Sequence, residues 1–156
     1  MTKLIFSFII LLHVTVLANS QVITGLWQFG SSEVNSGYFD TYQFFSDGTF
    51  KFNTDQNDGL RRILTIAGTY KLKKDTIIFS VKYSVEVVGG DISRSEISSR
   101  SDSWSIEGGK ITECKVKKLV SDNASFKLLD SGNQIKIILI DKRKYYKIDD
   151  DPNSFQ

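Results

Sequence analysis

Few side chains of this chain could carry out acid–base, nucleophilic or metal chemistry. There is one histidine, His13, and one cysteine, Cys114. His13 lies in an apolar run at residues 4–17. The small-x-small pattern Ala18-Asn19-Ser20 follows, an order typical of a cleaved secretory signal peptide. Removal of residues 1–20 leaves no histidine. That excludes His-based general acid–base catalysis, Ser/His and Cys/His nucleophile pairs, and histidine metal sites.

Carboxylates are the remaining candidates for chemistry. Neighbouring strands could bring Asp40, Glu86 or Glu113 together, although their spacing does not require it. The aspartate run at 149–151 could attract a cation, but it lacks the ligand spacing of a calcium loop. No glycine-rich loop follows a strand and opens a helix, so no nucleotide site is indicated. We therefore predict a protein that is not an enzyme, with no cofactor, catalytic residue or metal site.

Length and charge favour a single exported domain. The chain has 156 residues, with 20 basic and 18 acidic side chains. Cleavage after residue 20 leaves 136 residues, enough for one core, and loses Lys3, so the net charge falls from +2 to +1. This balance argues against nucleic acid as a partner. The apolar run is shorter than the roughly 20 residues of a membrane span, which predicts a secreted or periplasmic protein without a span after cleavage.

The state of Cys114 has two interpretations. The residue has no partner for an internal disulfide, since it is the only cysteine. It is either a half-buried thiol or a link between two chains.

Hydrophobic periodicity predicts an all-β fold. After residue 20, apolar residues recur mostly at every second position, and β-branched and aromatic residues are frequent. The clearest alternation runs from Thr76 to Val87. The expected strands include 23–29, 62–72, 76–87, 111–118, 125–129 and 134–141.

Residues 38–53 predict a hairpin. Asp47-Gly48 is a strong signal for a two-residue turn, because both positions tolerate positive φ. With this turn, Phe45 faces Phe50 and Gln43 faces Phe52. The interior face, which lacks charge, then contains Phe39, Thr41, Gln43, Phe45, Phe50 and Phe52. The exterior face contains Tyr38, Tyr42, Phe44, Lys51 and Asn53.

The next two strands are expected to place Tyr70 opposite Phe79 and Leu72 opposite Ile77, which keeps their interior faces together. Residues 89–103 are polar and predict a long exposed loop or a hairpin extension, after which Trp104 resumes a strand. The polar segment 149–156 is expected to be a flexible tail.

About nine or ten strands in meander order leave two exposed edges unless the sheet closes. We therefore predict an antiparallel up-and-down meander closed into a roughly eight-stranded barrel. Such a barrel has room for its own side chains or for one small ligand.

The segment Gly25-Leu26-Trp27 stands on the first expected strand after the signal peptide. Together with Asp47-Gly48-Thr49-Phe50, Gly68-Thr69-Tyr70 and Asp75-Thr76-Ile77, it resembles the lipocalins and the wider calycin group. It is most similar to the short lipocalin-like domains of secreted bacterial proteins. The resemblance implies a barrel domain over 21–148, with Trp27 plugging the closed end and Arg143 packing on it. Gly25 is expected to let the chain approach closely beside Trp27.

Two functions follow as hypotheses. In the first, the barrel interior binds a small apolar or amphipathic molecule. Its expected lining is Gln43, Phe45, Phe50, Phe52, Tyr70, Phe79, Tyr83 and Trp104. In the second, the barrel is solid, and the exterior aromatic residues Tyr38, Tyr42 and Phe44, together with the 89–103 loop, meet a protein or cell-surface partner.

Overall fold

The computed structural model describes residues 23–33, 39–94, 104–129 and 135–154. The expected signal segment 1–20, Tyr38 and residues 95–103 of the polar segment lie outside the described residues. The strands are β1 (Gly25–Phe29), β2 (Thr41–Phe44), β3 (Thr49–Asn53), β4 (Ile63–Lys73), β5 (Thr76–Val88), β6 (Asp91–Arg94), β7 (Trp104–Glu107), β8 (Lys110–Leu129), β9 (Ile137–Ile140) and β10 (Arg143–Asp149). In this part of the chain we find no helix long and apolar enough to cross a membrane.

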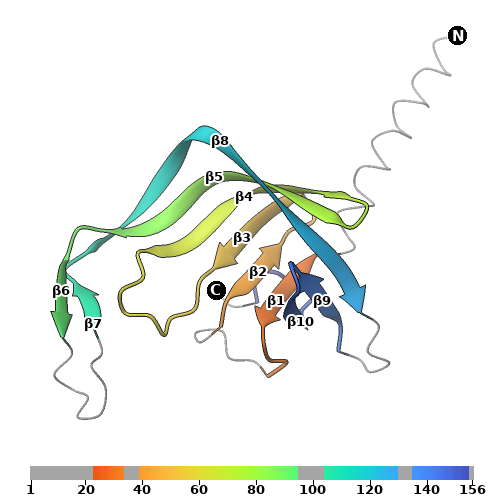
Figure 1. The fold of residues 1–156 in the computed structure, drawn as a ribbon, viewed down its shortest axis with the longest axis horizontal. Helices are drawn as coiled ribbons and strands as arrows, with labels where there is room; N and C mark the ends of the chain where they lie inside the picture. The colour runs from red at the N-terminus through yellow and green to blue at the C-terminus, as the bar shows by residue number, and fades with distance from the viewer. Residues whose placement is uncertain (1–22, 34–38, 95–103, 130–134, 155–156) are drawn as a thin grey trace, which may run out of the picture.

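Eight strands close into an antiparallel barrel in the order β1-β10-β9-β8-β5-β4-β3-β2. The remaining strands, β6 and β7, form a separate two-stranded ribbon inserted between β5 and β8 (Figure 1). The predicted all-β meander and its closure into about eight strands are therefore confirmed. The segments expected as separate strands at 111–118 and 125–129 are parts of the single 20-residue strand β8.

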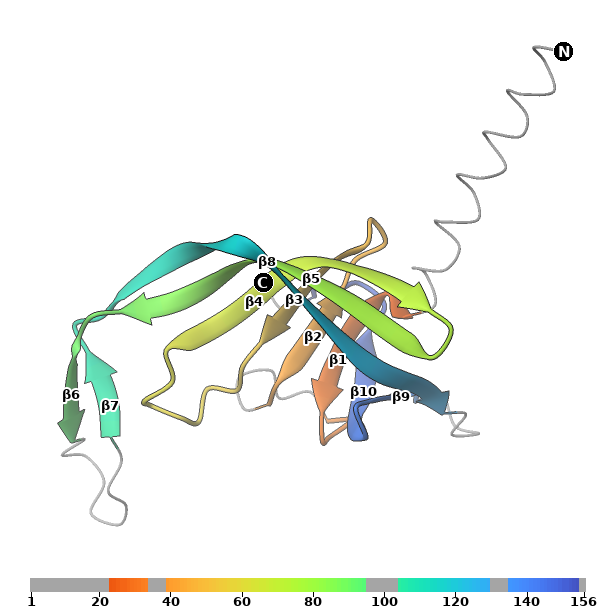
Figure 2. The ribbon, with the colours of Figure 1, turned by 45° about the horizontal axis from the view of Figure 1, so that its top comes forward.

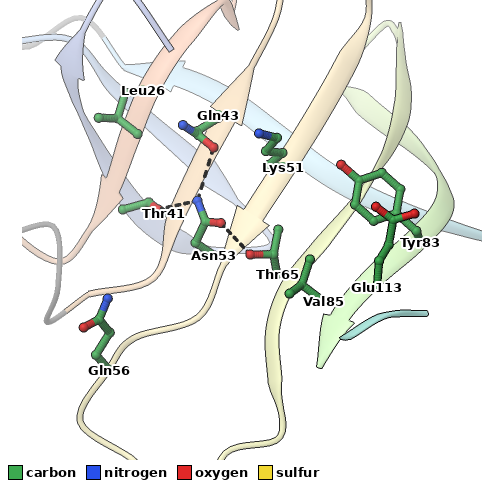
Figure 3. A pocket seen from close by; sticks show the side chains of 10 residues that line it. All are labelled: Leu26, Thr41, Gln43, Lys51, Asn53, Gln56, Thr65, Tyr83, Val85 and Glu113. Atoms are coloured by element: carbon green, nitrogen blue, oxygen red, sulfur yellow. Dashed lines mark hydrogen bonds between the residues drawn. The ribbon is translucent and has the colours of Figure 1, made fainter. Parts of the chain in front are cut away.

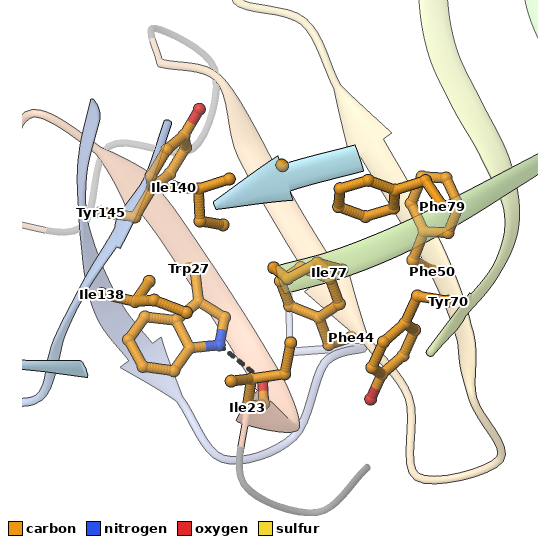
Figure 4. Packing of buried hydrophobic residues seen from close by; sticks show 11 residues of the cluster. Ile23, Trp27, Phe44, Phe50, Tyr70, Ile77, Phe79, Ile138, Ile140 and Tyr145 are labelled. Atoms are coloured by element: carbon orange, nitrogen blue, oxygen red, sulfur yellow. Dashed lines mark hydrogen bonds between the residues drawn. The ribbon is translucent and has the colours of Figure 1, made fainter. Parts of the chain in front are cut away.

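Aromatic side chains fill much of the barrel interior (Figure 4). Trp27 is 1% exposed, and its indole N–H donates a hydrogen bond to the carbonyl of Ile23 at 2.8 Å. The ring centroids of Phe50 and Phe79 lie 4.7 Å apart, within the range of favourable aromatic pairs. The buried cluster consists of Ile23, Trp27, Phe44, Phe50, Tyr70, Ile77, Phe79, Ala124, Ile138, Ile140 and Tyr145.

The β4–β5 hairpin has the predicted register. Tyr70 lies opposite Phe79, and Leu72 lies opposite Ile77. All four side chains belong to the interior cluster or pack against it. Here the alternation of apolar residues fixes the pairing, because a slip by one residue would turn these side chains to the outside.

The β2–β3 hairpin has a loop one residue longer than predicted. The N–H of Phe45 donates to the carbonyl of Thr49, which closes a three-residue loop, 46–48. Gly48 has a φ of 81°, as the last position of such a loop requires. The carboxylate of Asp47 accepts hydrogen bonds from the N–H and the hydroxyl of Thr49, at 2.8 and 2.6 Å, and so favours this loop.

The extra loop residue exchanges the two faces of β2, whereas Phe50 and Phe52 on β3 keep their predicted interior positions. Phe44 lies opposite Phe50, and Tyr42 lies opposite Phe52. The predicted exterior positions of Tyr42 and Phe44 are wrong, since both belong to the aromatic interior. The predicted interior positions of Thr41, Gln43 and Phe45 are also wrong, because the alternation places them on the outer face.

A β-bulge at Lys82 divides the long β4–β5–β8 layer into a barrel part and an arm. Val81 pairs with Gly68 and Tyr83 pairs with Ala67, so Lys82 is an extra residue on β5. Opposite it, β8 has its own irregularity, with residues 116–119 outside the register. Bulges bend strands and change which side chains share a face. The arm beyond the bulge extends away from the barrel and folds down into the β6–β7 ribbon (Figure 2).

Candidate binding groove

A groove of about 490 Å³ lies outside the barrel, between the outer face of β1–β3 and the arm. We call it the outer groove, and its lining is shown in Figure 3. The lining residues are Leu26, Thr41, Gln43, Lys51, Asn53, Gln56, Thr65, Tyr83, Val85 and Glu113. The bulge at Lys82 explains its shape, because the bend turns Tyr83 and Val85 of the arm toward the same side as Thr65.

A chain of hydrogen bonds runs across the floor of the outer groove. The side-chain amide of Asn53 donates to the Thr41 hydroxyl and to the Gln43 carbonyl oxygen, each at 3.3 Å. Its own carbonyl oxygen accepts a bond from the Thr65 hydroxyl at 2.9 Å. Thr41, Asn53 and Thr65 lie directly opposite one another on β2, β3 and β4. The strand register therefore assembles this polar network and holds its amides in fixed orientations.

The network is buried at Thr41 and Gln43 and half-buried at Asn53 and Thr65. Thr41 and Gln43 are each 5% exposed. A buried polar group without a hydrogen-bond partner lowers the free energy of unfolding by about 1–3 kcal/mol. The hydrogen bonds of the network are therefore needed for Thr41 and Gln43 to be buried on the outer face. Amide and hydroxyl oxygens can accept more than one hydrogen bond, and of these residues the half-buried Asn53 and Thr65 are the more accessible to a ligand.

Charged and aromatic residues form the walls. Lys51 and Glu113 bring one charge of each sign, and neither forms an ion pair within the described residues. The Lys51 ammonium lies 5.9 Å from the centroid of the Phe45 ring. Tyr83 and Val85 supply a less polar wall. The balance of charge suits a polar ligand without a strong net charge.

The C-terminal segment lies against the same outer face. The Gln43 amide donates a hydrogen bond to the carbonyl of Pro152. Asn153 lines a second hollow of about 470 Å³, which shares Lys51 and Tyr83 with the outer groove. Part of the segment expected to be a flexible tail thus contacts the outer groove through Gln43 and lines the second hollow through Asn153.

The residues predicted to form one interior ligand site are divided among several places. Phe50, Phe52, Tyr70 and Phe79 face the barrel interior. Gln43 and Tyr83 line the outer groove, and Phe45 lines the second hollow. The predicted interior placement of Gln43 and Phe45 is wrong because the β2–β3 loop is one residue longer than predicted. The predicted interior placement of Tyr83 is wrong because of the bulge at Lys82.

Trp104 was expected to line the barrel interior. It lies instead on β7, outside the barrel, and is 48% exposed. Its strand contacts the β3–β4 loop, where the N–H of Ile106 donates to the carbonyl of Gly59 at 3.1 Å. Residues 89–103 were predicted to form a long exposed loop or a hairpin extension. The pairing of β6 with β7 outside the barrel agrees with the hairpin extension.

The residues expected to close the barrel have different partners from those predicted. At Gly25, a Cβ atom would lie 2.5 Å from the carbonyl oxygen of Asp149, so a close approach does require glycine. The Arg143 guanidinium lies 4.2 Å from the Phe29 ring centroid and pairs with Asp40 at 2.8 Å, so its predicted packing on Trp27 is wrong. Lys147, which is opposite Trp27 on β10, lies over the indole at 5.7 Å.

The buried tyrosines keep their protons. Burial raises the pKa of Tyr70 and of Tyr145 to about 12, and it also raises the pKa of Tyr42. The Tyr70 hydroxyl donates to the carbonyl of Phe45 at 3.2 Å. These phenols are therefore neutral structural groups near pH 7 and do not act as bases there.

Comparison with known proteins gives no family and no relative. No protein-family model, curated protein or solved structure matches this chain. The eight-stranded antiparallel barrel is consistent with a lipocalin-like fold. This statement concerns architecture only, since it rests on strand order and closure.

Proposed function

We propose that this chain is a binding protein that holds a small hydroxyl-rich ligand, such as a short oligosaccharide, in the outer groove without catalysing a reaction. The hydrogen-bond chain from Thr41 through Asn53 to Thr65 carries the proposal. A fixed row of neutral donors and acceptors beside the Tyr83 ring complements sugar hydroxyls and an apolar sugar face. The absence of histidine after residue 20 supports binding rather than His-based catalysis.

The packing of the interior favours the outer groove over the barrel as the ligand site. Phe44 is fully buried, and its ring lies 5.0 Å from that of Tyr70. Phe79 is in turn 4.7 Å from Phe50. An apolar ligand inside the barrel would have to displace rings that already contact one another. Interior binding therefore stands as the competing hypothesis.

We also propose that the chain belongs to the lipocalin-like barrels and is exported after cleavage near residue 20. The Gly25-Leu26-Trp27 motif at the start of an antiparallel eight-stranded meander supports the first point. The apolar run at 4–17 followed by small residues supports the second. N-terminal sequencing of protein recovered outside the cytoplasm tests the export. An N-terminus still at Met1 would contradict it.

A printed array of neutral and acidic oligosaccharides, followed by calorimetry with the tightest one, tests the function. Asn53→Ala should weaken binding at least about tenfold, because it removes three hydrogen bonds of the groove floor. Phe79→Leu is the matched interior control and should change affinity less than about twofold. An array without any bound sugar would contradict the proposal.

A fluorescent fatty acid provides the competing arm of that experiment. Saturable binding that Phe79→Leu abolishes and Asn53→Ala leaves unchanged would place the ligand in the barrel interior. We expect no saturable fatty-acid binding.

A further inference from the structure

Part of β8 in the arm has an open backbone edge. The N–H of Val87 donates to the carbonyl of Arg62 on the β4 side, so the backbone groups of Val87 point away from β8. Directions alternate along a strand, so Ser84 and Glu86 point toward β8. Their partners, Cys114 and Thr112, therefore point back toward β5.

The backbone groups of the alternate residues of β8 point away from β5, toward the open edge. The backbone N–H and C=O groups of Ile111, Glu113 and Lys115 have no partner among the described residues. β9 pairs only with residues 126–129 of β8 and does not cover this stretch. Ile111 is 70% exposed, and Glu113 and Lys115 are exposed as well. An open edge of this kind is a template for another strand.

We propose that a second copy of this chain adds its own β8 edge here, antiparallel and centred on Cys114, to form a two-fold symmetric dimer. Charge selects both the partner and the register. Around that centre, Glu113 lies opposite the partner's Lys115, and Lys115 lies opposite the partner's Glu113. The pairing thus places opposite charges across the strand pair twice.

Neighbouring registers are less favourable. Two β8 edges can pair only if residues whose backbone groups point to the open edge lie opposite one another. The allowed registers therefore have their symmetry centres at successive residues of the strand. A centre at Glu113 or at Lys115 places identical charges directly opposite each other, which is destabilising. A centre at Thr112 pairs Glu113 with Ile111 of the partner subunit and gains no ion pair. The sequence of this short edge therefore specifies one arrangement.

The β8 irregularity limits the size of the assembly. Residues 116–119 depart from the β5 register directly after this stretch. A bulge ends strand pairing locally, and Lys117 and Lys118 within it discourage further strands. A self-complementary interface closes at two copies, so the edge is used up in the dimer. Its small size predicts a reversible association that depends on concentration.

Sedimentation velocity of the full chain over a range of concentrations tests the dimer. Glu113→Lys and Lys115→Glu should each weaken dimerisation by about tenfold or more, because each places like charges opposite one another. The double variant E113K/K115E restores opposite charges and should dimerise within about threefold of the native chain. A native chain that stays monomeric at the highest soluble concentration would overturn the proposal. So would a double variant no better than the single ones.

Cys114 reports the register. In the proposed pairing it faces its own copy at a non-hydrogen-bonded position, with Cα atoms about 4.5 Å apart, a separation that a disulfide can bridge. Treatment with diamide should give a cross-linked dimer that dithiothreitol reverses. Diamide takes one proton and one electron from each of the two thiols and is reduced to the hydrazine, while the sulfur–sulfur bond forms.

The control moves the thiol by two residues. In the variant C114S/T112C, the two thiols lie on opposite sides of the symmetry axis, about four residues apart along the strands, and are too distant to join. We expect no diamide-dependent dimer from it. Equally fast cross-linking of both proteins would show that the thiols meet by collision and would contradict the register.

Discussion

The two faces of the β2–β3 hairpin differ completely in chemistry, although their residues alternate along the same strands. The inner face carries four aromatic residues, Tyr42, Phe44, Phe50 and Phe52. The outer face carries Thr41, Gln43, Lys51 and Asn53, all of which line the outer groove. The inner face therefore packs into the core, and the outer face presents hydrogen-bonding groups to the groove. A single hairpin thus supports the core and presents the candidate site.

This comparison shows how a loop one residue longer determines a binding surface. The three-residue loop at 46–48 sets Phe44 opposite Phe50. A two-residue loop would place Gln43 inside the core and Phe44 in water. The side-chain period of a strand is two, so every residue of β2 would change face together, while β3 would keep Phe50 and Phe52 inside.

The largest effect is expected from comparing the two tryptophans, Trp27 inside the barrel and Trp104 on the β6–β7 ribbon. Trp27→Ala should lower the free energy of unfolding by about 3–5 kcal/mol, since the indole is 1% exposed and hydrogen-bonded. Trp104→Ala should cost less than about 1 kcal/mol, since Trp104 is 48% exposed. Urea unfolding curves give both values. If Trp104→Ala destabilised the protein more than Trp27→Ala, the assignment of Trp27 to the core and of Trp104 to an exposed ribbon would be contradicted.

Two adjacent phenylalanines sharpen the comparison, Phe44 at the end of β2 and Phe45 directly after it. Phe44→Ala should destabilise the fold by about 3 kcal/mol, because Phe44 is fully buried. Phe45→Ala should cost about 1 kcal/mol, because Phe45 is only half-buried on the outer face. The same unfolding assay applies, and equal losses would argue against the three-residue loop.

Alkaline pH probes the interior through its tyrosines. Burial raises the pKa of Tyr145 from 10.0 to about 12. The unfolded chain then releases this proton more readily than the folded one. The stability contributed by Tyr145 is complete below pH 10 and is lost as the pH rises to about 12, with a change of about 2 kcal/mol at most. Tyr145→Phe should flatten this part of the pH profile, measured by urea unfolding at each pH.

The smallest effect concerns the loop itself. Hydrogen bonds from Thr49 hold the pKa of Asp47 below its ordinary value. Their stabilisation is present above about pH 3.8 and fades as the pH falls and the carboxylate is protonated. Asp47→Ala should cost about 1 kcal/mol at pH 7 and almost nothing at pH 2. A pH-independent loss would mean that the carboxylate does not hold the loop.

The sequence predicts the fold class and the β4–β5 register because alternation is regular there and one face must be buried. It could also have predicted the β2–β3 register, since Tyr42, Phe44, Phe50 and Phe52 are all even-numbered aromatic residues. The Asp-Gly turn signal outweighed that pattern, although a three-residue loop also ends in glycine.

The outer groove has no comparable signal in the sequence. The alternation from Thr76 to Val87 continues without a break across Lys82, yet a bulge there changes the face. Bulges of this kind follow from the pairing of three strands and from the bend of the whole sheet. Glu113 enters the groove only through its pairing with Val85, nearly thirty residues earlier in the chain. Such a site can be recognised only once the strands are paired.

Nuclear magnetic resonance of the labelled protein separates the two faces in a single titration. The probe is the oligosaccharide bound most tightly on the array. We predict that the side-chain amide signals of Gln43 and Asn53 shift on addition of the sugar, while the indole N–H of Trp27, bonded to Ile23, stays unchanged. A shift of the Trp27 signal with unchanged Gln43 and Asn53 amides would place the ligand inside the barrel and contradict the outer groove as the binding site.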